Sequence, residues 1–199
     1  GEGAAGLALG KFFWGWGFGG VVVCDREGVI DPGRAGLKSA KEWLAQNTNA
    51  DGVWGCVAEA IIGADVYMGL SGPGLVTRDD VAAMADKPIV FAMANPEPEI
   101  LPEAIADSAA IVATGRSDYP NQNNNVLAFP GIFRGAFDAK ASDITENMKI
   151  AAAGAIAGAI SSDDMGPDLI IPTAFDRSVV PAVSQAVAAA AIEDGVPRQ

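Results

Sequence analysis

The sequence has 199 residues, half of them hydrophobic, which suffices to bury one substantial core near the upper end of single-domain sizes. Its 25 acidic residues outnumber 13 basic ones, and the basic residues form no cluster, so we expect no nucleic-acid partner. The absence of histidine excludes Ser-His-Asp and Cys-His nucleophile systems and the commonest zinc sites.

The longest apolar stretches are much shorter than the roughly 20 residues that span a bilayer, and no signal peptide is recognisable. Cys24 and Cys56 are too few for a disulfide framework and favour reduced thiols. We therefore expect a soluble, cytoplasmic, globular protein of one domain, without a membrane partner.

Residues 1–6 read GEGAAG and match the Gly-x-Gly-x-x-Gly pattern of dinucleotide sites. There the glycines allow a tight turn, close approach to a pyrophosphate and close helix–strand packing, and the N-terminus of the following helix binds the anion. We expect that helix over Leu7–Phe13. The strand that normally precedes the motif is not in the sequence, because Gly1 is its first residue.

The apolar run Val21–Cys24 predicts a strand that ends at Asp25, 19 residues after Gly6. At this spacing an acid binds the adenosine ribose hydroxyls and repels a 2′-phosphate, which favours NAD over NADP. Arg26 leaves NADP open as the alternative cofactor, and the simpler interpretation of Asp25 is that it only ends a strand. The glycine-rich aromatic segment before this run, Phe12–Gly20, suits neither a stable helix nor a clean linker.

Helical and extended segments then alternate, which is typical of a parallel sheet covered on both faces. We expect an α/β fold, a Rossmann-type doubly wound parallel sheet with its first strand missing. The expected helices are Gly36–Gln46, Val53–Ile62, a segment capped by Thr77, and Pro102–Ser108. The expected strands are Asp65–Leu70, Ile89–Met93 and Ala110–Ala113.

Polar residues follow the strands of this predicted sheet. Asp25, Ser71, Asn95 and the loop 114–125 all come at strand ends, where open α/β sheets bind their ligands. The loop contains Asn121, Asn123, Asn124 and Asn125, and such amides need hydrogen-bonding partners when they are sheltered from water. They predict either a ligand contact or a solvated loop that caps a helix starting near Val126.

The remaining chain predicts a long alanine-rich helix over Asp143–Ile160, with Asp143 and Glu146 spaced as an acidic capping box. A short strand, Leu169–Ile171, and a closing helix capped by Asp176 follow. No repeat or internal domain boundary is recognisable.

The motifs GEGAAG, VVVCDREG, ADVYMGLSGPG, IVFAMANPEPEI, TGRSDYPNQNNNVLAFPGIFRGA and DLIIPTAFD occur in this order. With them the chain, over nearly its whole length, resembles the NAD-binding domain of bacterial malic enzymes. FAMANP and NNVLAFPGIFRGA are the most specific pieces.

The resemblance implies oxidative decarboxylation of malate to pyruvate and CO2, with NAD, or alternatively NADP, as cofactor and Mg or Mn bound to the substrate. It implies that Gly1, Gly3, Ala5 and Gly6 hold the pyrophosphate, Asp25 the ribose, and that Ser71 borders the cofactor cleft. It further implies that Asn95 lies where nicotinamide meets malate, and that Asn124 and Asn125 bind substrate. Asn121 and Asn123 keep a structural interpretation.

In the family, the catalytic tyrosine and lysine and the metal-binding carboxylates lie upstream of the glycine motif. We therefore expect residues 1–199 to be the NAD(P)-binding domain, a fragment without catalytic or metal-binding residues of its own and inactive alone, of an enzyme that is homodimeric in full. One alternative is a noncatalytic module that binds a nucleotide or a partner chain. Another is a different dehydrogenase that shares only the cofactor fold.

Overall fold

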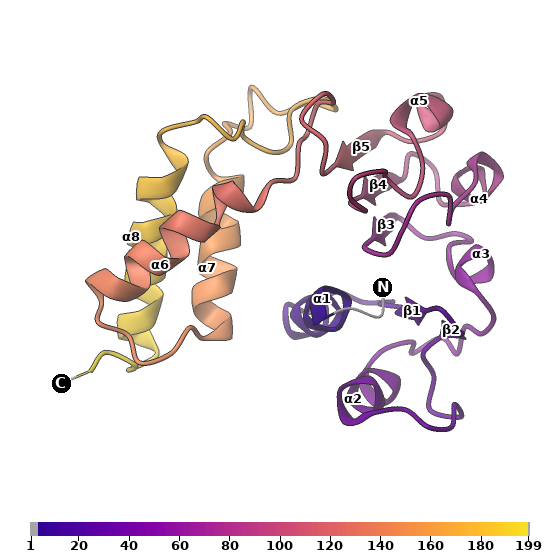
Figure 1. Ribbon diagram of the computed structural model, residues 1–199, viewed down its shortest axis with the longest axis horizontal. Coiled ribbons are helices and arrows are strands. Elements are labelled where there is room, and N and C mark those ends of the chain that lie inside the picture. Colours follow the sequence, from indigo (N-terminus) through magenta and orange to yellow (C-terminus); the bar gives the residue numbers. More distant parts are fainter. Residues whose placement is uncertain (1–3, 199) are drawn as a thin grey trace. The chain divides into compact units, whose positions relative to one another are not determined.

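A computed structural model of the protein describes residues 4–198 (Figure 1). By its internal contacts the chain divides into an N-terminal unit, residues 1–115, and a C-terminal unit, residues 116–199. Within residues 4–198, every helix is too short or too polar to cross a bilayer. The single NAD(P)-binding domain over residues 1–199 stays a prediction.

A parallel sheet is the centre of the N-terminal unit. Its strands are β3 (Val66–Gly69), β4 (Ile89–Ala92) and β5 (Ile111–Thr114), hydrogen-bonded in that order. Val66 pairs with Ile89, and Ile89 with Ile111, so all three strands end at the same edge. These are the apolar β-branched runs that the sequence predicts as strands, and the parallel α/β arrangement is confirmed.

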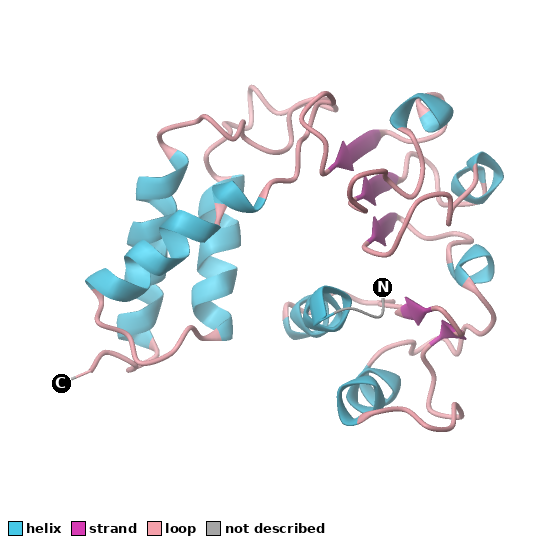
Figure 2. Cartoon of the chain, viewed as in Figure 1, coloured by secondary structure: helices cyan, strands magenta, loops and turns pink. Residues whose placement is uncertain are grey.

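Short helices connect these strands and lie to one side of the sheet (Figures 1 and 2). They are α3 (Val57–Ala60), α4 (Arg78–Ala82) and α5 (Pro102–Ile105). The Thr77 side chain accepts a hydrogen bond from the Asp80 amide, which confirms Thr77 as the cap of α4. Val90 and Ala92 of β4 and Ile105 of α5 are fully buried in the core between sheet and helices.

The first part of this unit is built differently from the expectation. Strand β1 (Cys24–Asp25) pairs antiparallel with β2 (Gly28–Val29), so Asp25 lies in a hairpin rather than at the end of a parallel strand. The prediction that Val21–Cys24 forms a strand of the main sheet is wrong for a simple reason. The carbonyls of Val21 and Val23 accept hydrogen bonds from Asn49 and Ile30, so no parallel neighbour takes them.

Helix α1 (Ala4–Gly15) confirms the predicted helix Leu7–Phe13, but it begins three residues earlier, within the glycine motif, and ends two residues later. It packs against α2 (Ser39–Asn47), where a Cβ on Gly10 would lie 3.0 Å from a Leu44 methyl group. The aromatic rings of the segment 12–20 contact one another edge to face, and Trp14 contacts Trp43 of α2 in the same way. These contacts give the segment a packing role.

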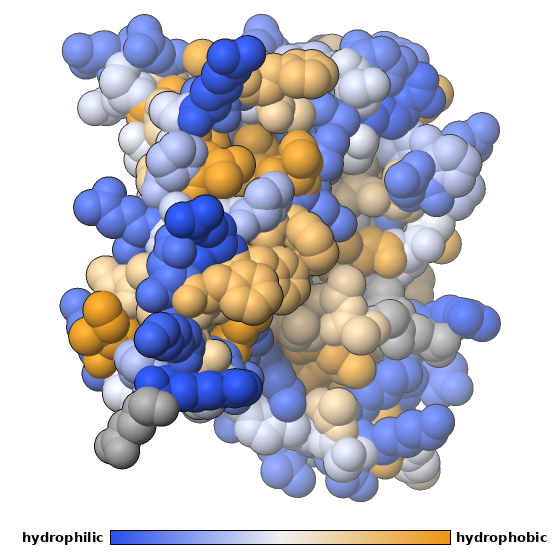
Figure 3. Space-filling model, turned by 60° about the vertical axis from the view of Figure 1, so that its left-hand side comes forward, coloured by the Kyte–Doolittle hydropathy of each residue, from blue (hydrophilic) through white to orange (hydrophobic). Residues whose placement is uncertain are grey.

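The C-terminal unit consists mainly of helices. A 3-10 turn, η1 (Asn125–Leu127), leads into α6 (Phe129–Asp138), and α7 (Glu146–Ala157) and α8 (Val179–Glu193) follow. Glycines bring α6 close to α8, since a Cβ on Gly135 would lie 2.4 Å from the Ser184 carbonyl oxygen. The opposite face of α6 exposes Phe129, Phe133 and Phe137. Figure 3 shows such apolar areas between polar ones on the molecular surface.

Three expectations for this unit are wrong. Thr145, not Asp143, caps α7, because its hydroxyl accepts from the Met148 amide whereas the Asp143 carboxylate accepts from the adjacent Ile144 amide. Residues 169–171 are not a strand, because the Ile170 amide donates to a side chain, as described below. Asp176 does not cap α8 directly; its carboxylate accepts from the amide and hydroxyl of Ser178, one residue before the helix.

Candidate functional site

The carboxyl edge of the β3–β4–β5 sheet carries two of the predicted site residues. Ser71 follows β3 and Asn95 follows β4, and both are exposed. Because β3 and β4 are adjacent and parallel, their two following loops start from the same edge. The predicted position at one edge of the sheet is therefore confirmed for Ser71 and Asn95, whereas Asp25 lies in the separate β1–β2 hairpin.

A third polar residue of this edge was not singled out from the sequence. Glu99 is fully buried, and its carboxylate accepts hydrogen bonds from the backbone amides of Ser71 at 2.8 Å and Ala94 at 3.1 Å. In the sequence, Glu99 lies between Pro98 and Ile100, and in the structure both of these neighbours are buried. An acid in apolar surroundings needs dedicated donors, but the sequence did not show which ones.

The N-terminal unit also contains a partly buried tyrosine near this carboxylate. Burial raises the pKa of Tyr67, and the negative charge of Glu99 raises it further. The phenol therefore stays protonated at physiological pH. Tyr67 is partly buried and packs against the core of the sheet.

The glycine motif is only partly covered by the described residues. Gly1 and Gly3 lie outside them, whereas Ala5 and Gly6 lie in the first turn of α1. Gly6 is buried and Ala5 is exposed. A 12-residue helix leaves amides without intrahelical partners in its first turn, and these amides fit an anion such as a pyrophosphate.

Asp25 lies in a dense ionic cluster. Its side chain is only 1% exposed, and its two carboxylate oxygens accept from one guanidinium nitrogen of Arg34, each at 2.7 Å. The Lys41 ammonium donates at 2.6 Å to one oxygen, and the Glu27 amide donates at 2.9 Å to the other. Each oxygen thus has two donors, which matches the capacity of a carboxylate.

Two opposing effects act on the pKa of Asp25. Burial alone would raise it, but the hydrogen bonds from Lys41 and Arg34 outweigh burial, so the pKa lies below its usual value. The carboxylate is therefore ionised at neutral pH. In the adjacent position of β1, burial raises the pKa of the Cys24 thiol to about 11, so this thiol is protonated and a poor nucleophile. Asp25 fits a ribose hydroxyl only if one of its present donors gives way.

The asparagine-rich loop belongs to the C-terminal unit, and its members differ. Asn121 is 5% exposed, donates to the Pro167 carbonyl at 2.7 Å and accepts from the Ile170 amide at 2.8 Å. It has the structural role expected from the sequence. Asn124 caps η1, because its side-chain oxygen accepts from the Val126 amide at 3.1 Å, which confirms the predicted capping near Val126.

Asn123 and Asn125 of the same loop are exposed. Capping by Asn124 uses its carbonyl oxygen, whereas binding a substrate carboxylate would use its amide N–H groups. The two functions are therefore compatible in one side chain. The substrate roles of Asn124 and Asn125 stay predictions.

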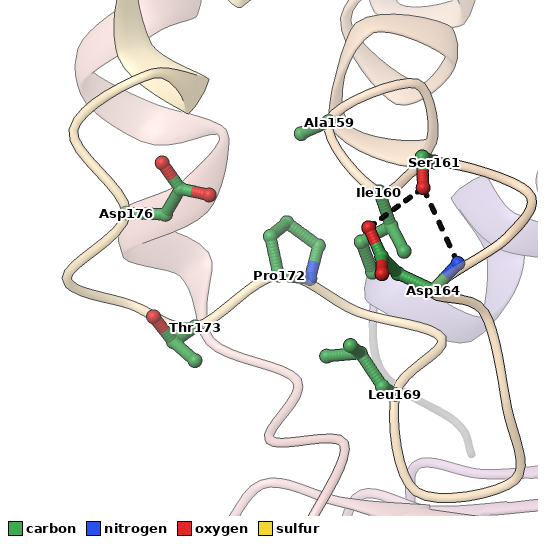
Figure 4. Close-up of a pocket in the computed structure, with 8 residues that line it drawn as sticks. All are labelled: Ala159, Ile160, Ser161, Asp164, Leu169, Pro172, Thr173 and Asp176. Atoms are coloured by element: carbon green, nitrogen blue, oxygen red, sulfur yellow. Dashed lines mark hydrogen bonds between the residues drawn. The ribbon is translucent and has the colours of Figure 1, made fainter.

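The C-terminal unit contains a cavity of about 300 Å³ (Figure 4). Its polar lining consists of Asp164 and Asp176 with the hydroxyls of Ser161 and Thr173. The Ser161 hydroxyl and the Asp164 carboxylate are hydrogen-bonded to each other at 2.7 Å. No residue that the sequence analysis assigned to a site lines this cavity.

Within residues 4–198, no group of three or more His, Cys, Asp or Glu side chains has a geometry that could hold a metal ion. The buried carboxylate of Asp25 is already neutralised by Arg34 and Lys41.

The parallel sheet, the polar residues at its carboxyl edge and the helix that follows a glycine motif define an α/β domain of the dinucleotide-binding class. The sequence model of the family described as "Malic enzyme, NAD binding domain" matches residues 19–195. The chain belongs to this family, and the family predicted from its motifs is confirmed.

Similar proteins agree with this assignment. The chain is 50% identical to the bifunctional malic/malolactic enzyme of Bacillus subtilis (strain 168), 48% to the NAD-dependent malic enzyme of Geobacillus stearothermophilus and 46% to the NADP-dependent malic enzyme of Rhizobium meliloti (strain 1021). All of the chain is matched in each case. It covers 49%, 42% and 28% of these relatives, so it spans about half of their length or less.

Solved structures give the same result. The crystal structure of Entamoeba histolytica malic enzyme superposes with a TM-score of 0.92 at 38% identity, over 100% of this chain and 43% of that one. The NAD-dependent malic enzyme of Thermotoga maritima has a TM-score of 0.88 at 41% identity, over 94% of this chain and 50% of that one. The Rossmann-type α/β class predicted from the sequence is therefore confirmed.

Proposed function

We propose that this chain is the NAD(P)-binding part of a malic enzyme, which oxidatively decarboxylates malate to pyruvate and CO2 with reduction of NAD(P). The observation that supports this most directly is the parallel sheet whose carboxyl edge carries Ser71 and Asn95, in a chain of the malic enzyme NAD binding domain family. The full enzyme would act in the cytoplasm as a homodimer.

The proposed roles follow the chain. The first turn of α1, with Ala5 and Gly6, holds the pyrophosphate together with Gly1 and Gly3. Ser71 borders the cofactor cleft, and Asn95 contacts both the nicotinamide side and the substrate. Asn124 and Asn125 bind a substrate carboxylate. Both asparagines carry amide donors that suit an anionic oxygen.

Asp25 binds the adenosine ribose in this proposal, and the structure adds a condition. A ribose hydroxyl has to replace one of the donors that now saturate the carboxylate. Lys41 is the donor that gives way, because its side chain is more exposed than that of Arg34, 21% against 13%. The displaced ammonium stays beside the ribose, where it would also tolerate a 2′-phosphate.

The bound NAD(P) supplies hydride acceptance, and the substrate-bound Mg or Mn supplies charge stabilisation for decarboxylation. The residues of this chain bind and orient. Protons and metal are handled by residues outside it, in the upstream part that malic enzymes have. A noncatalytic nucleotide-binding or partner-binding module is the second candidate, and the fully bonded carboxylate of Asp25 favours it.

Calorimetry separates the two candidates. We expect the 199-residue chain to bind NAD, with NADP as the weaker ligand. Asn95→Ala should weaken NAD binding, because it removes an exposed amide that contacts the cofactor without disturbing the core. Gln46→Ala, which truncates an exposed amide on α2, is the matched control and should bind like the wild type.

Absence of binding of either nucleotide would leave the partner-binding module as the better candidate. A second assay tests whether the catalytic groups lie outside this chain. With malate, NAD and Mn, the chain alone should produce no NADH, and NADH formation at an enzyme-like rate would contradict the proposal that the catalytic groups lie elsewhere.

A further inference from the structure

Glu99 is the most completely buried acid at the carboxyl edge of the sheet. Its exposed fraction is 0%, and its neighbours Pro98 and Ile100 are buried too. A carboxylate in such surroundings is costly unless donors compensate for the lost water. A hydrophobic residue of similar volume would leave the Ser71 and Ala94 amides without an acceptor, so the acid at this position serves to bind the backbone of the two loops.

The donors identify what the carboxylate holds. One oxygen accepts from the Ser71 amide, in the loop after β3, and the other accepts from the Ala94 amide, in the loop after β4. Ala94 immediately precedes Asn95. A single side chain thus fixes the backbone of both loops that carry the proposed cofactor contacts of this edge.

The last residue of β3 has no side chain where the carboxylate lies. A Cβ on Gly69 would be 2.3 Å from the carboxyl carbon of Glu99 and 2.5 Å from one of its oxygens. Any larger residue at position 69 would push the carboxylate out of its place. Gly69 therefore leaves free the small volume that the Glu99 carboxylate occupies, and only one of the two positions can place a side chain there.

We propose that Glu99 is a positioning residue for the nicotinamide side of the cofactor cleft, an inference that rests on the proposed function above. Its carboxylate holds the Ser71 and Asn95 loops at the spacing that the bound dinucleotide needs. The adenosine side depends instead on the Asp25 cluster, which is built from β1, α2 and the loop between β2 and α2. Loss of Glu99 should therefore affect the two halves of the cofactor unequally.

The test compares NAD with AMP, which has only the adenosine half, by calorimetry on the 199-residue chain. Glu99→Gln keeps the shape of the side chain, but its NH2 group is a donor and cannot accept a hydrogen bond from one of the two backbone amides. It should weaken NAD binding about tenfold, the effect of losing one charge-assisted hydrogen bond, and leave AMP binding unchanged. Glu97→Gln removes an exposed carboxylate from the same loop and is the matched control.

Gly69→Ala perturbs the same carboxylate from its other side and should reproduce the Glu99→Gln pattern. In a Glu99→Ala background the added methyl has room, so Gly69→Ala should have little further effect on NAD binding. Additive losses in the double variant would show that Gly69 acts independently of Glu99 and would contradict the shared volume.

The outcomes separate this inference from the proposed function. If the wild type binds no NAD, the proposed function fails. If the wild type binds NAD and Glu99→Gln binds it equally well, or if NAD and AMP weaken together, the positioning role is overturned.

If Glu99→Gln does not fold, hydrogen exchange of the backbone amides in the wild type tests the inference instead. The Ser71 and Ala94 amides should exchange more slowly than those of the surrounding exposed loop. Rapid exchange of both would overturn the inference.

Discussion

Replacing Asp25 by Asn tests the buried ionic cluster of the N-terminal unit. The change keeps the size of the side chain but removes the buried negative charge that Arg34 and Lys41, whose side chains are 13% and 21% exposed, share. Removing one partner of a buried, hydrogen-bonded ion pair costs about 3–5 kcal/mol, and the residual hydration of the two cations favours the lower end. At about 2–4 °C per kcal/mol for a chain of this length, the melting temperature should fall by about 6–12 °C.

The pH dependence of this effect has a defined sign. Because the pKa of Asp25 is lower in the folded chain than the usual value of about 3.9, its stabilisation is present above that value. It is lost as the pH falls through the folded pKa. The difference in melting temperature between wild type and Asp25→Asn should therefore be full at pH 7 and shrink below about pH 4.

Glu27→Gln is the control, because Glu27 contacts the same Arg34 at 2.8 Å but is 74% exposed. Such surface pairs contribute at most about 1 kcal/mol. Thermal unfolding followed by circular dichroism measures both variants. If Asp25→Asn lowers the melting temperature no more than Glu27→Gln, or lowers it equally at pH 7 and pH 3, the cluster does not hold β1 and α2 together as described.

Three further predictions concern packing and caps, each checked by the free energy of unfolding in urea. Gly135→Ala should destabilise the protein by about 2 kcal/mol or more, because α8 occupies the space that the new methyl group would need. Gly154→Ala, on the open face of α7, should instead stabilise it by about 0.5–1 kcal/mol. Equal effects of the two substitutions would refute the packing of α6 against α8. Asn121→Ala should cost about 2 kcal/mol or more by leaving the Ile170 amide without its acceptor, and a neutral result would contradict this role. Thr77→Ala should cost about 1 kcal/mol, and no loss would argue against the cap of α4.

The sequence predicted those parts of the fold that depend on local pattern. The strands β3, β4 and β5 are short apolar runs bounded by turn residues, and each lies within one or two residues of its predicted bounds. Thr77 was identifiable because a cap needs only residues three positions apart. The polar residues Ser71 and Asn95 were placed correctly because parallel strands end at one edge.

The failures have long-range causes. Residues 21–25 look like a sheet strand, but distant amides of Ile30 and Asn49 take their carbonyls. Residues 169–171 look like a strand too, and there the side chain of Asn121, 49 positions before Ile170, replaces the strand partner. Local pattern contains no information about such partners.

In the candidate site, too, the sequence predicted what depends on local pattern and missed what depends on distant residues. The motif spacing pointed to Asp25, but nothing near it in the sequence showed that Arg34 and Lys41 saturate its carboxylate. Glu99 was missed because one of its two donors, the Ser71 amide, and the space left by Gly69 lie 28 and 30 positions away.

The volume that Gly69 shares with Glu99 also has a consequence for how this sequence can vary. Position 69 tolerates a side chain only where position 99 is shortened, and an acid at 99 is accommodated only beside a glycine. Within the family the two positions should therefore change together, although each is far from the other along the chain. A homologue that carries a larger residue at position 69 is expected to have lost the acid at position 99. Its two strand-end loops would then be fixed by some other contact.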